Sequence, residues 1–161
     1  YSREKPNKYG LDEYNRNLEY RRLKDMAKKS SIEEYLPSKA DVMNFIMLYD
    51  FLESAYIEMK DFSKKNPDAA LNERKVKSLN RILKDIKNIL QNEPTASYMD
   101  ILDEEMLPSN SDVVLTMSQY RSALENYRKK YRRYHNYDNF WHTTDGEIKA
   151  KDLEGDRPQW R

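Results

Sequence analysis

No glycine occurs between Leu11 and Asp145, and this absence constrains the fold more than any other feature of the sequence. The three glycines are Gly10, Gly146 and Gly155. Glycine supplies the positive backbone φ angles on which tight hairpin turns, β-bulges and phosphate-binding loops depend. The sequence therefore argues against a sheet fold and against a P-loop or dinucleotide-binding loop. Helices joined by proline-marked turns remain.

Apolar residues recur at steps of three and four in long segments, which is the spacing of an amphipathic helix. The main predicted helices span residues 39–64, 72–91 and 111–138, and a shorter one spans 97–106. Residues 11–29 are helical by propensity and form either a fourth helix or a peripheral arm. Prolines lie where the periodicity is interrupted. The predicted fold class is all-α, a small antiparallel helical bundle with extended N- and C-terminal arms.

The first of these helices has the strongest local signals. Ser38 and Asp41 have the spacing of a capping box, in which the two side chains satisfy each other's backbone N–H groups. A stripe on one side of the helix predicts its core face, and it contains Val42, Phe45, Tyr49, Leu52, Tyr56 and Met59. A second apolar row, which includes Phe51, predicts that this helix lies between neighbouring elements.

The predicted domain organisation has three parts: residues 1–37 as a partly helical N-terminal arm, 38–141 as the bundle, and 142–161 as an extended C-terminal tail. The large apolar groups of the tail are Ile148, Leu153 and Trp160. Their burial does not offset the backbone entropy of ordering the tail, at about 1–2 kcal/mol per residue. We therefore expect the tail to bind a partner through Trp160. The alternatives are a disordered tail and one that folds back over the last helix.

The last predicted helix outlasts the apolar stripe of the helix before it. The tyrosines of this helix continue its apolar stripe, which we call the seam and which packs against the bundle. Tyr131 and Tyr134 are expected to extend beyond the bundle, where their hydroxyls need hydrogen-bond partners. The predicted partner-binding residues are accordingly Tyr131, Tyr134, Phe140, Trp141 and Trp160.

Basic residues stand beside that seam in two rows, Arg128 with Arg132 and Lys129 with Arg133. Like charges at i,i+4 repel by about 0.2–0.5 kcal/mol per pair, so an acidic partner would relieve a local cost. The acidic run "DILDEE" of this chain is one candidate, and a polyanion whose bases stack on neighbouring aromatic rings is another. Because the formal net charge is only +1, a nucleic acid ranks behind a protein as the predicted partner.

Catalytic and metal-binding signals are weak. The chain has no cysteine, which excludes disulfides, thiolate metal sites and a cysteine nucleophile. His135, Asp138 and His142 form an H-x2-D-x3-H pattern, but no second cluster completes a coordination shell. No glycine flanks a serine as a nucleophile elbow requires. The sequence predicts no enzyme, metal, cofactor or small-molecule ligand.

The longest apolar run, "FIMLY", is far shorter than the roughly 18 residues that span a bilayer. The lack of cysteine favours an intracellular location. The cytoplasm and the mitochondrion both stay open, because the chain begins at Tyr1 and a removed targeting peptide is one explanation. The predicted function is a non-enzymatic structural or adaptor subunit of a larger multiprotein assembly. The alternative is an RNA-associated helical protein that uses residues 127–142.

Overall fold

The protein divides into two units, an N-terminal helix and a larger helical unit that carries a small sheet. The computed structural model describes residues 8–32, 35–157 and 160, and the two units are residues 1–35 and 36–161. The first seven residues of the predicted N-terminal arm, and residues 158, 159 and 161 of the predicted tail, lie outside the described residues.

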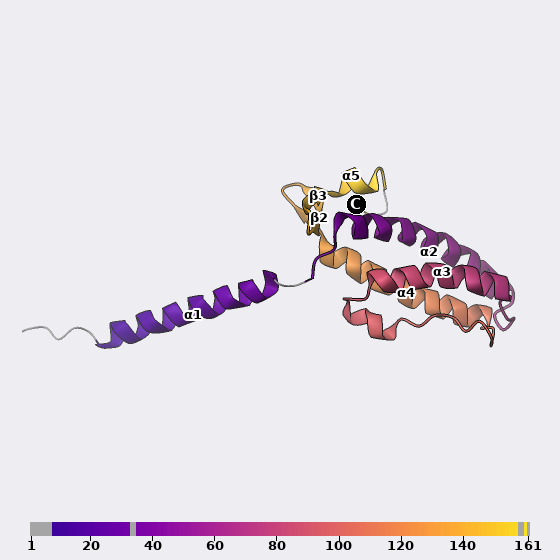
Figure 1. Ribbon diagram of the computed structural model, residues 1–161, viewed down its shortest axis with the longest axis horizontal. Helices are drawn as coiled ribbons and strands as arrows, with labels where there is room; N and C mark the ends of the chain where they lie inside the picture. Colours follow the sequence, from indigo (N-terminus) through magenta and orange to yellow (C-terminus); the bar gives the residue numbers. More distant parts are fainter. Residues whose placement is uncertain (1–7, 33–34, 158–159, 161) are drawn as a thin grey trace, which may run out of the picture. The chain divides into compact units, whose positions relative to one another are not determined.

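The first unit contains α1 (Lys8–Ile32). This helix includes the predicted segment 11–29 and is drawn in indigo in Figure 1. All side chains from residue 12 to residue 26 are exposed. The described part of α1 therefore has no core of its own.

The second unit contains the remaining elements of the described chain. They are α2 (Lys39–Lys65), α3 (Glu73–Ile89), the 3-10 helix η1 (Pro94–Tyr98), α4 (Asn110–Tyr131), β1 (Arg132–His135), β2 (Asp138–Thr143), β3 (Gly146–Lys149) and α5 (Ala150–Glu154). The observed bounds of α2 and α3 lie within two residues of the predicted ones. None of the helices in the described ranges is both long and apolar enough to cross a membrane.

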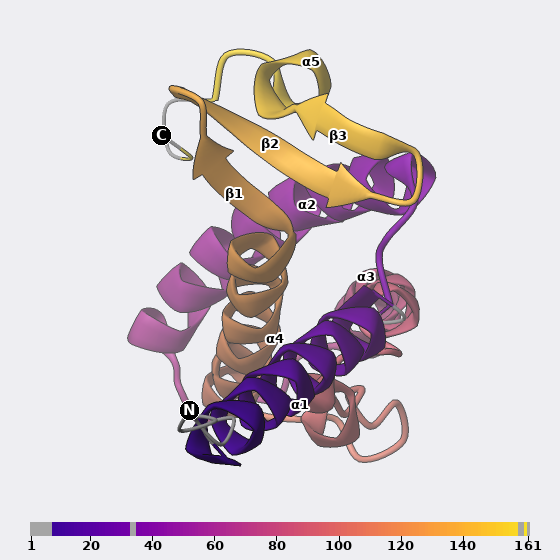
Figure 2. The same ribbon diagram turned by 90° about the vertical axis from the view of Figure 1, so that its left-hand side faces the viewer.

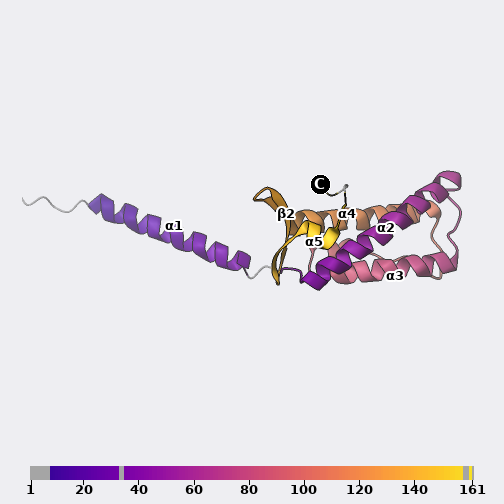
Figure 3. The same ribbon diagram turned by 90° about the horizontal axis from the view of Figure 1, so that it is seen from above.

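α2 is the central helix of this unit. It begins at the predicted capping box, where the Asp41 backbone N–H donates to Ser38 Oγ over 3.1 Å and the Ser38 N–H donates to the Asp41 carboxylate over 2.9 Å. α2 packs against both α3 and α4, and Figure 3 shows it running obliquely across them. The core includes Val42, Phe45, Leu52, Val76, Leu83, Ile86, Val113, Met117, Tyr120, Leu124 and Tyr127. Val42, Phe45 and Leu52 belong to the stripe that the sequence predicts for α2.

The segment between α3 and α4 is held by polar side chains of both helices. Asn80, which is buried, donates to the Leu102 carbonyl over 2.8 Å and accepts from the Leu102 N–H over 2.9 Å. The Tyr120 hydroxyl donates to the Asp100 carbonyl, and burial raises the pKa of Tyr120. The predicted short helix at 97–106 is wrong: η1 ends at Tyr98, and the backbone of the next residues is not helical but bonds to these side chains.

The prediction of an all-α fold is wrong, because a three-stranded antiparallel sheet in the order β1-β2-β3 follows α4. The predicted helix 111–138 ends at Tyr131. Residues 132–143 alternate between the two faces of the sheet, with Trp141 and Thr143 buried on one face. Tyr134, predicted to lie on the last helix, lies in β1 and is exposed. These residues form strands, whose side chains alternate with a period of two, because this arrangement buries Trp141.

The first hairpin turn shows why the glycine argument fails. Asn136 and Tyr137 connect β1 to β2 and both have positive φ, 47° and 63°. Two consecutive positive φ angles are characteristic of the type I′ turn that suits a two-residue hairpin, and asparagine tolerates this region well. Tyrosine takes the second position, where glycine is usual. The second turn is formed by Thr144 and Asp145, and Gly146, the first residue of β3, follows it with a φ of 95°. The Asp-Gly pair that marks this hairpin was present in the sequence.

The prediction of an extended C-terminal tail is also wrong for the described residues. The Asp145 carboxylate accepts from the Lys39 N–H over 2.8 Å, and the Thr144 N–H donates to the Pro37 carbonyl over 2.9 Å. These bonds attach the second hairpin turn to the start of α2. Figure 2 shows the sheet and α5 together at the end of the unit where α4 stops. Trp160 is only 2% exposed, so the tail folds back on its own bundle.

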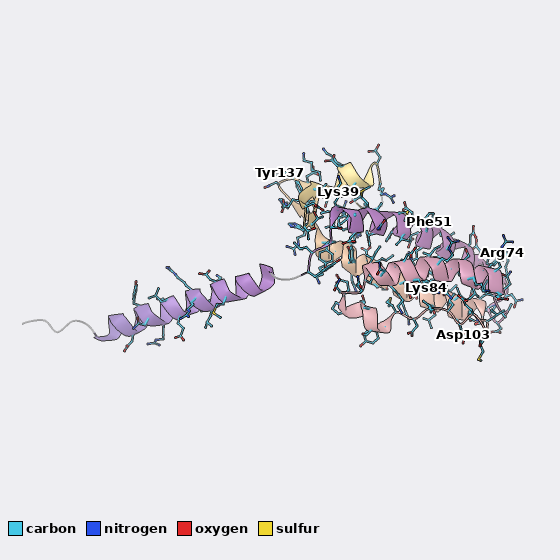
Figure 4. All side chains as sticks on the ribbon, in the orientation of Figure 1. Lys39, Phe51, Arg74, Lys84, Asp103 and Tyr137 are labelled. Atoms are coloured by element: carbon cyan, nitrogen blue, oxygen red, sulfur yellow. The ribbon has the colours of Figure 1, made fainter. Side chains whose placement is uncertain are left out.

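We expect Tyr137→Gly to stabilise the protein by about 0.5–1 kcal/mol. Glycine removes the roughly 1–2 kcal/mol cost of a left-handed conformation, although its greater freedom in the unfolded chain offsets part of that gain. Tyr137 is 96% exposed and lies at the hairpin tip (Figure 4), so little packing is lost. Urea unfolding measures the change, with Asn136→Gly as the control of smaller expected effect. An equal or lower stability of Tyr137→Gly would contradict this account.

Candidate functional site

α2 carries a second apolar surface that the described second unit leaves uncovered. Met43, Met47 and Phe51 follow one another at steps of four, so they lie in one row along the helix. Their exposed fractions are 53%, 48% and 53%. Phe51 is labelled on α2 in Figure 4. The predicted second apolar row of α2 includes Phe51 but not Met43 or Met47, and neighbouring elements of this unit do not cover Phe51.

This row borders a groove between α2 and α3 of about 250 Å³. The groove is lined by Met47, Leu48, Phe51, Ser78, Arg81, Ile82 and Asp85. The apolar side chains of the groove thus come mainly from α2, whereas α3 contributes one positively and one negatively charged side chain. We call the groove and the adjoining Met43 the α2–α3 groove.

A wider groove between α2 and α4, of about 540 Å³, has a different character. Arg121 forms a bidentate ion pair with Glu53, and its guanidinium lies 4.2 Å from the centre of the Tyr56 ring. Glu125 pairs with Arg128, whose hydrogen bond lowers the pKa of that carboxyl group. The charges that line this groove are therefore largely paired within the chain.

The buried side of the sheet contains an ion pair that the sequence did not indicate. The Glu154 carboxylate accepts from Arg132 Nε over 2.9 and 3.1 Å and from the Trp141 indole N–H over 2.6 Å. The side chains of Arg132 and Glu154 are only 9% and 3% exposed. This cluster joins β1, β2 and α5. An open cavity of about 400 Å³ lies beside it, lined in part by Arg132, Glu154 and Trp160.

The outer side of the sheet brings both histidines together. The directly paired His142 and Glu147 share this face, and the ring of His135 stacks on Phe140 with centroids 4.4 Å apart. His135 Nε2 lies 3.0 Å from Glu147 Oε2, and His142 Nδ1 lies 3.4 Å from Glu147 Oε1. Asp138 belongs to the sequence pattern but not to this cluster. The third member, Glu147, comes from β3, which lies within the predicted C-terminal tail.

The residues predicted to bind a partner are placed very differently from one another. Tyr131, Trp141 and Trp160 are 1%, 0% and 2% exposed. The Tyr131 hydroxyl donates to Glu93, so it obtains its hydrogen bond inside the chain. Phe140 is half-buried, while Tyr134 is 67% exposed. Tyr134 is therefore the predicted residue with the most surface to offer.

The four predicted polyanion contacts do not form a continuous strip. Arg128 pairs with Glu125 on α4, and Arg132 is buried against Glu154. Lys129 and Arg133 are exposed. Because the chain itself neutralises Arg128 and Arg132, the basic surface is smaller than the sequence suggests.

The fold and these surfaces together define a helical module with a C-terminal three-stranded meander. Comparison with protein-family models, with curated proteins and with solved structures finds no match to this chain.

Proposed function

We propose that this chain is a non-catalytic interaction subunit that binds an amphipathic helix of a protein partner in the α2–α3 groove. The observation that carries the proposal is the row of Met43, Met47 and Phe51, each about half exposed beside the groove. Helix-in-groove recognition uses apolar anchors spaced along one helical face. Methionine side chains adapt their shape to such anchors, and they are frequent at binding surfaces of this kind.

The chemistry of the groove supports a helical peptide as the occupant. Fully burying a side chain such as that of Phe51 contributes about 1.5–3 kcal/mol. Arg81 and Asp85 line the groove beside the apolar residues and can pair with opposite charges on the partner. Such pairs at the rim favour one orientation of the bound helix more than they add affinity. The proposed occupant is therefore a helix with one apolar face, and positively and negatively charged side chains lie on either side of that face.

The division into two units fits the role of an adaptor. α1 presents Tyr14, Leu18, Tyr20, Leu23 and Met26 as exposed apolar side chains. A helix without a core of its own commonly gains stability from packing against another surface. We expect the first unit to supply a contact separate from the α2–α3 groove.

Amphipathic helical peptides selected on the full chain by display should depend on this groove. We expect Phe51→Asp and Met47→Asp each to weaken the binding of selected peptides by about tenfold or more, the equivalent of at least about 1.4 kcal/mol. The matched control is Leu115→Asp, because Leu115 on α4 is 60% exposed but does not line the groove. Fluorescence anisotropy of labelled peptides measures the affinities, and circular dichroism checks the fold of each variant.

Two outcomes would overturn the proposal. One is a failure to select any helical peptide, and the other is a set of peptides that the groove variants bind as well as the wild type. Salt-dependent binding of single-stranded RNA that is lost on changing Lys129 and Arg133 to serine would instead favour the nucleic-acid alternative.

A further inference from the structure

The outer face of the sheet gathers three metal-binding side chains from three consecutive strands. His135 lies on β1, His142 on β2 and Glu147 on β3. Side chains at alternate positions of a strand, and those directly opposite in a pair, point to the same face. The register His142↔Glu147 and the stacking of His135 on Phe140 place the three on the face opposite the buried Trp141.

The separations between the side chains are those of a coordination site. One potential ligand atom from each of the three residues lies within 4.8 Å of the other two. His135 Nε2 lies 3.0 Å from Glu147 Oε2, and His142 Nδ1 lies 3.4 Å from the other carboxylate oxygen, Oε1. Each of these distances is close to the edge of a coordination tetrahedron. That edge is about 3.3 Å when metal–ligand bonds are about 2.0–2.1 Å.

We propose that His135, His142 and Glu147 form a Zn²⁺ site on the outer face of the sheet. Two imidazole nitrogens and one carboxylate oxygen are a borderline ligand set that favours Zn²⁺ over Mg²⁺ or Ca²⁺, which prefer oxygen ligands alone. With neutral imidazoles the ligand set carries one negative charge, which attracts the cation. The inference is independent of the α2–α3 groove and goes beyond the proposed function.

The surroundings of the three side chains suit such a site. The stacked ring of Phe140, tilted only 18° from that of His135, holds the imidazole in one orientation. The side chains of His135, His142 and Glu147 are 34%, 24% and 45% exposed, so the cluster lies at the surface, while the His135 Nε2 atom itself is buried. The same exposure leaves a fourth coordination position for water or for a side chain of a partner.

Binding at this place connects the three strands through one ion. Because zinc binds the folded arrangement of ligands far better than the unfolded chain, it raises stability in proportion to the logarithm of its free concentration. The site would thus reinforce a sheet whose first turn carries the unfavourable backbone of Tyr137.

The test uses ZnCl₂ with the full chain in isothermal titration calorimetry. We expect one Zn²⁺ per chain, and an increase in the midpoint of thermal unfolding when zinc is present. His135→Gln, His142→Gln and Glu147→Gln should each weaken binding by more than the roughly 10–100-fold that changes outside the ligand set usually cost. Asp138→Asn is the matched control, because Asp138 lies in the same hairpin and sequence pattern but outside the cluster.

Cobalt provides a second measurement that does not depend on heat. A Co²⁺ complex of the wild type should show the strong visible absorption of tetrahedral coordination, and the His142→Gln variant should not. Circular dichroism without metal verifies that each variant is folded. The proposal is overturned if the folded wild type binds no zinc, if binding is the same in the three ligand variants, or if Asp138→Asn loses binding as they do.

Discussion

Glu154→Ala is expected to destabilise the protein by about 3–5 kcal/mol, the range for removing one partner of a buried ion pair. The substitution leaves the Arg132 guanidinium, with a side chain only 9% exposed, without its counter-charge. It also removes the acceptor of the Trp141 indole N–H, and a buried donor without a partner costs about 1–3 kcal/mol. The two costs share one site and are not additive.

Urea unfolding followed by far-ultraviolet circular dichroism measures this effect. Asp152→Ala is the matched control, because Asp152 is an exposed carboxylate on the same helix. The double variant Arg132→Met with Glu154→Leu should recover part of the lost stability, since replacing both charges removes the unpaired one, whereas the Trp141 indole N–H still lacks its acceptor. A loss below about 1 kcal/mol for Glu154→Ala would show that water screens this pair in solution.

Trp160→Ala is expected to cost about 3–5 kcal/mol of stability, as for other large-to-small changes of a buried aromatic residue. The Trp160 ring lies edge-on to Tyr49 at 4.9 Å and near Phe45 at 5.9 Å, measured between ring centroids. Arg157, which pairs with Asp50 of α2, holds its guanidinium 5.2 Å from the indole ring. The residue therefore connects the C-terminal segment to α2.

Hydrogen exchange on the isolated chain locates the effect of this variant. We expect slow exchange of the β2 and β3 amides in the wild type, and faster exchange in Trp160→Ala. Trp160→Phe should lie between the two, because a smaller ring keeps part of the contact. If Trp160 instead served only to anchor a partner, the free Trp160→Ala chain would be as stable and as protected as the wild type.

The main helices and much of the core are predictable because their signals are local. The stripes of α2 and α3 repeat at helical spacing, and the capping residues Ser38 and Ser109 mark two helix starts. The sheet was missed because the helical spacing of the apolar stripe continues through Tyr131 and Tyr134, although residues 132–143 form strands with a period of two. Local spacing does not choose between them, whereas the burial of Trp141 does.

The candidate sites were predictable only in part. His135 and His142 were identified from their spacing, but Glu147 joins them through the register of β3. Phe51 was identified as apolar, and its exposure depends on where α3 crosses α2. At both sites the sequence identified the type of residue, but it did not identify the residues that lie beside it in the folded chain.

The sequence by itself determined that α2, α3 and most of α4 are helical and which faces of those helices are apolar, because both depend on residues within one or two turns of each other. The tertiary structure decided that Arg132 meets Glu154, that Asp145 bonds to the start of α2, and that Trp160 is buried. These contacts join residues 22, 106 and, for Trp160 with Tyr49, 111 positions apart. Such pairs form only when the whole chain closes on itself, so no local pattern encodes them.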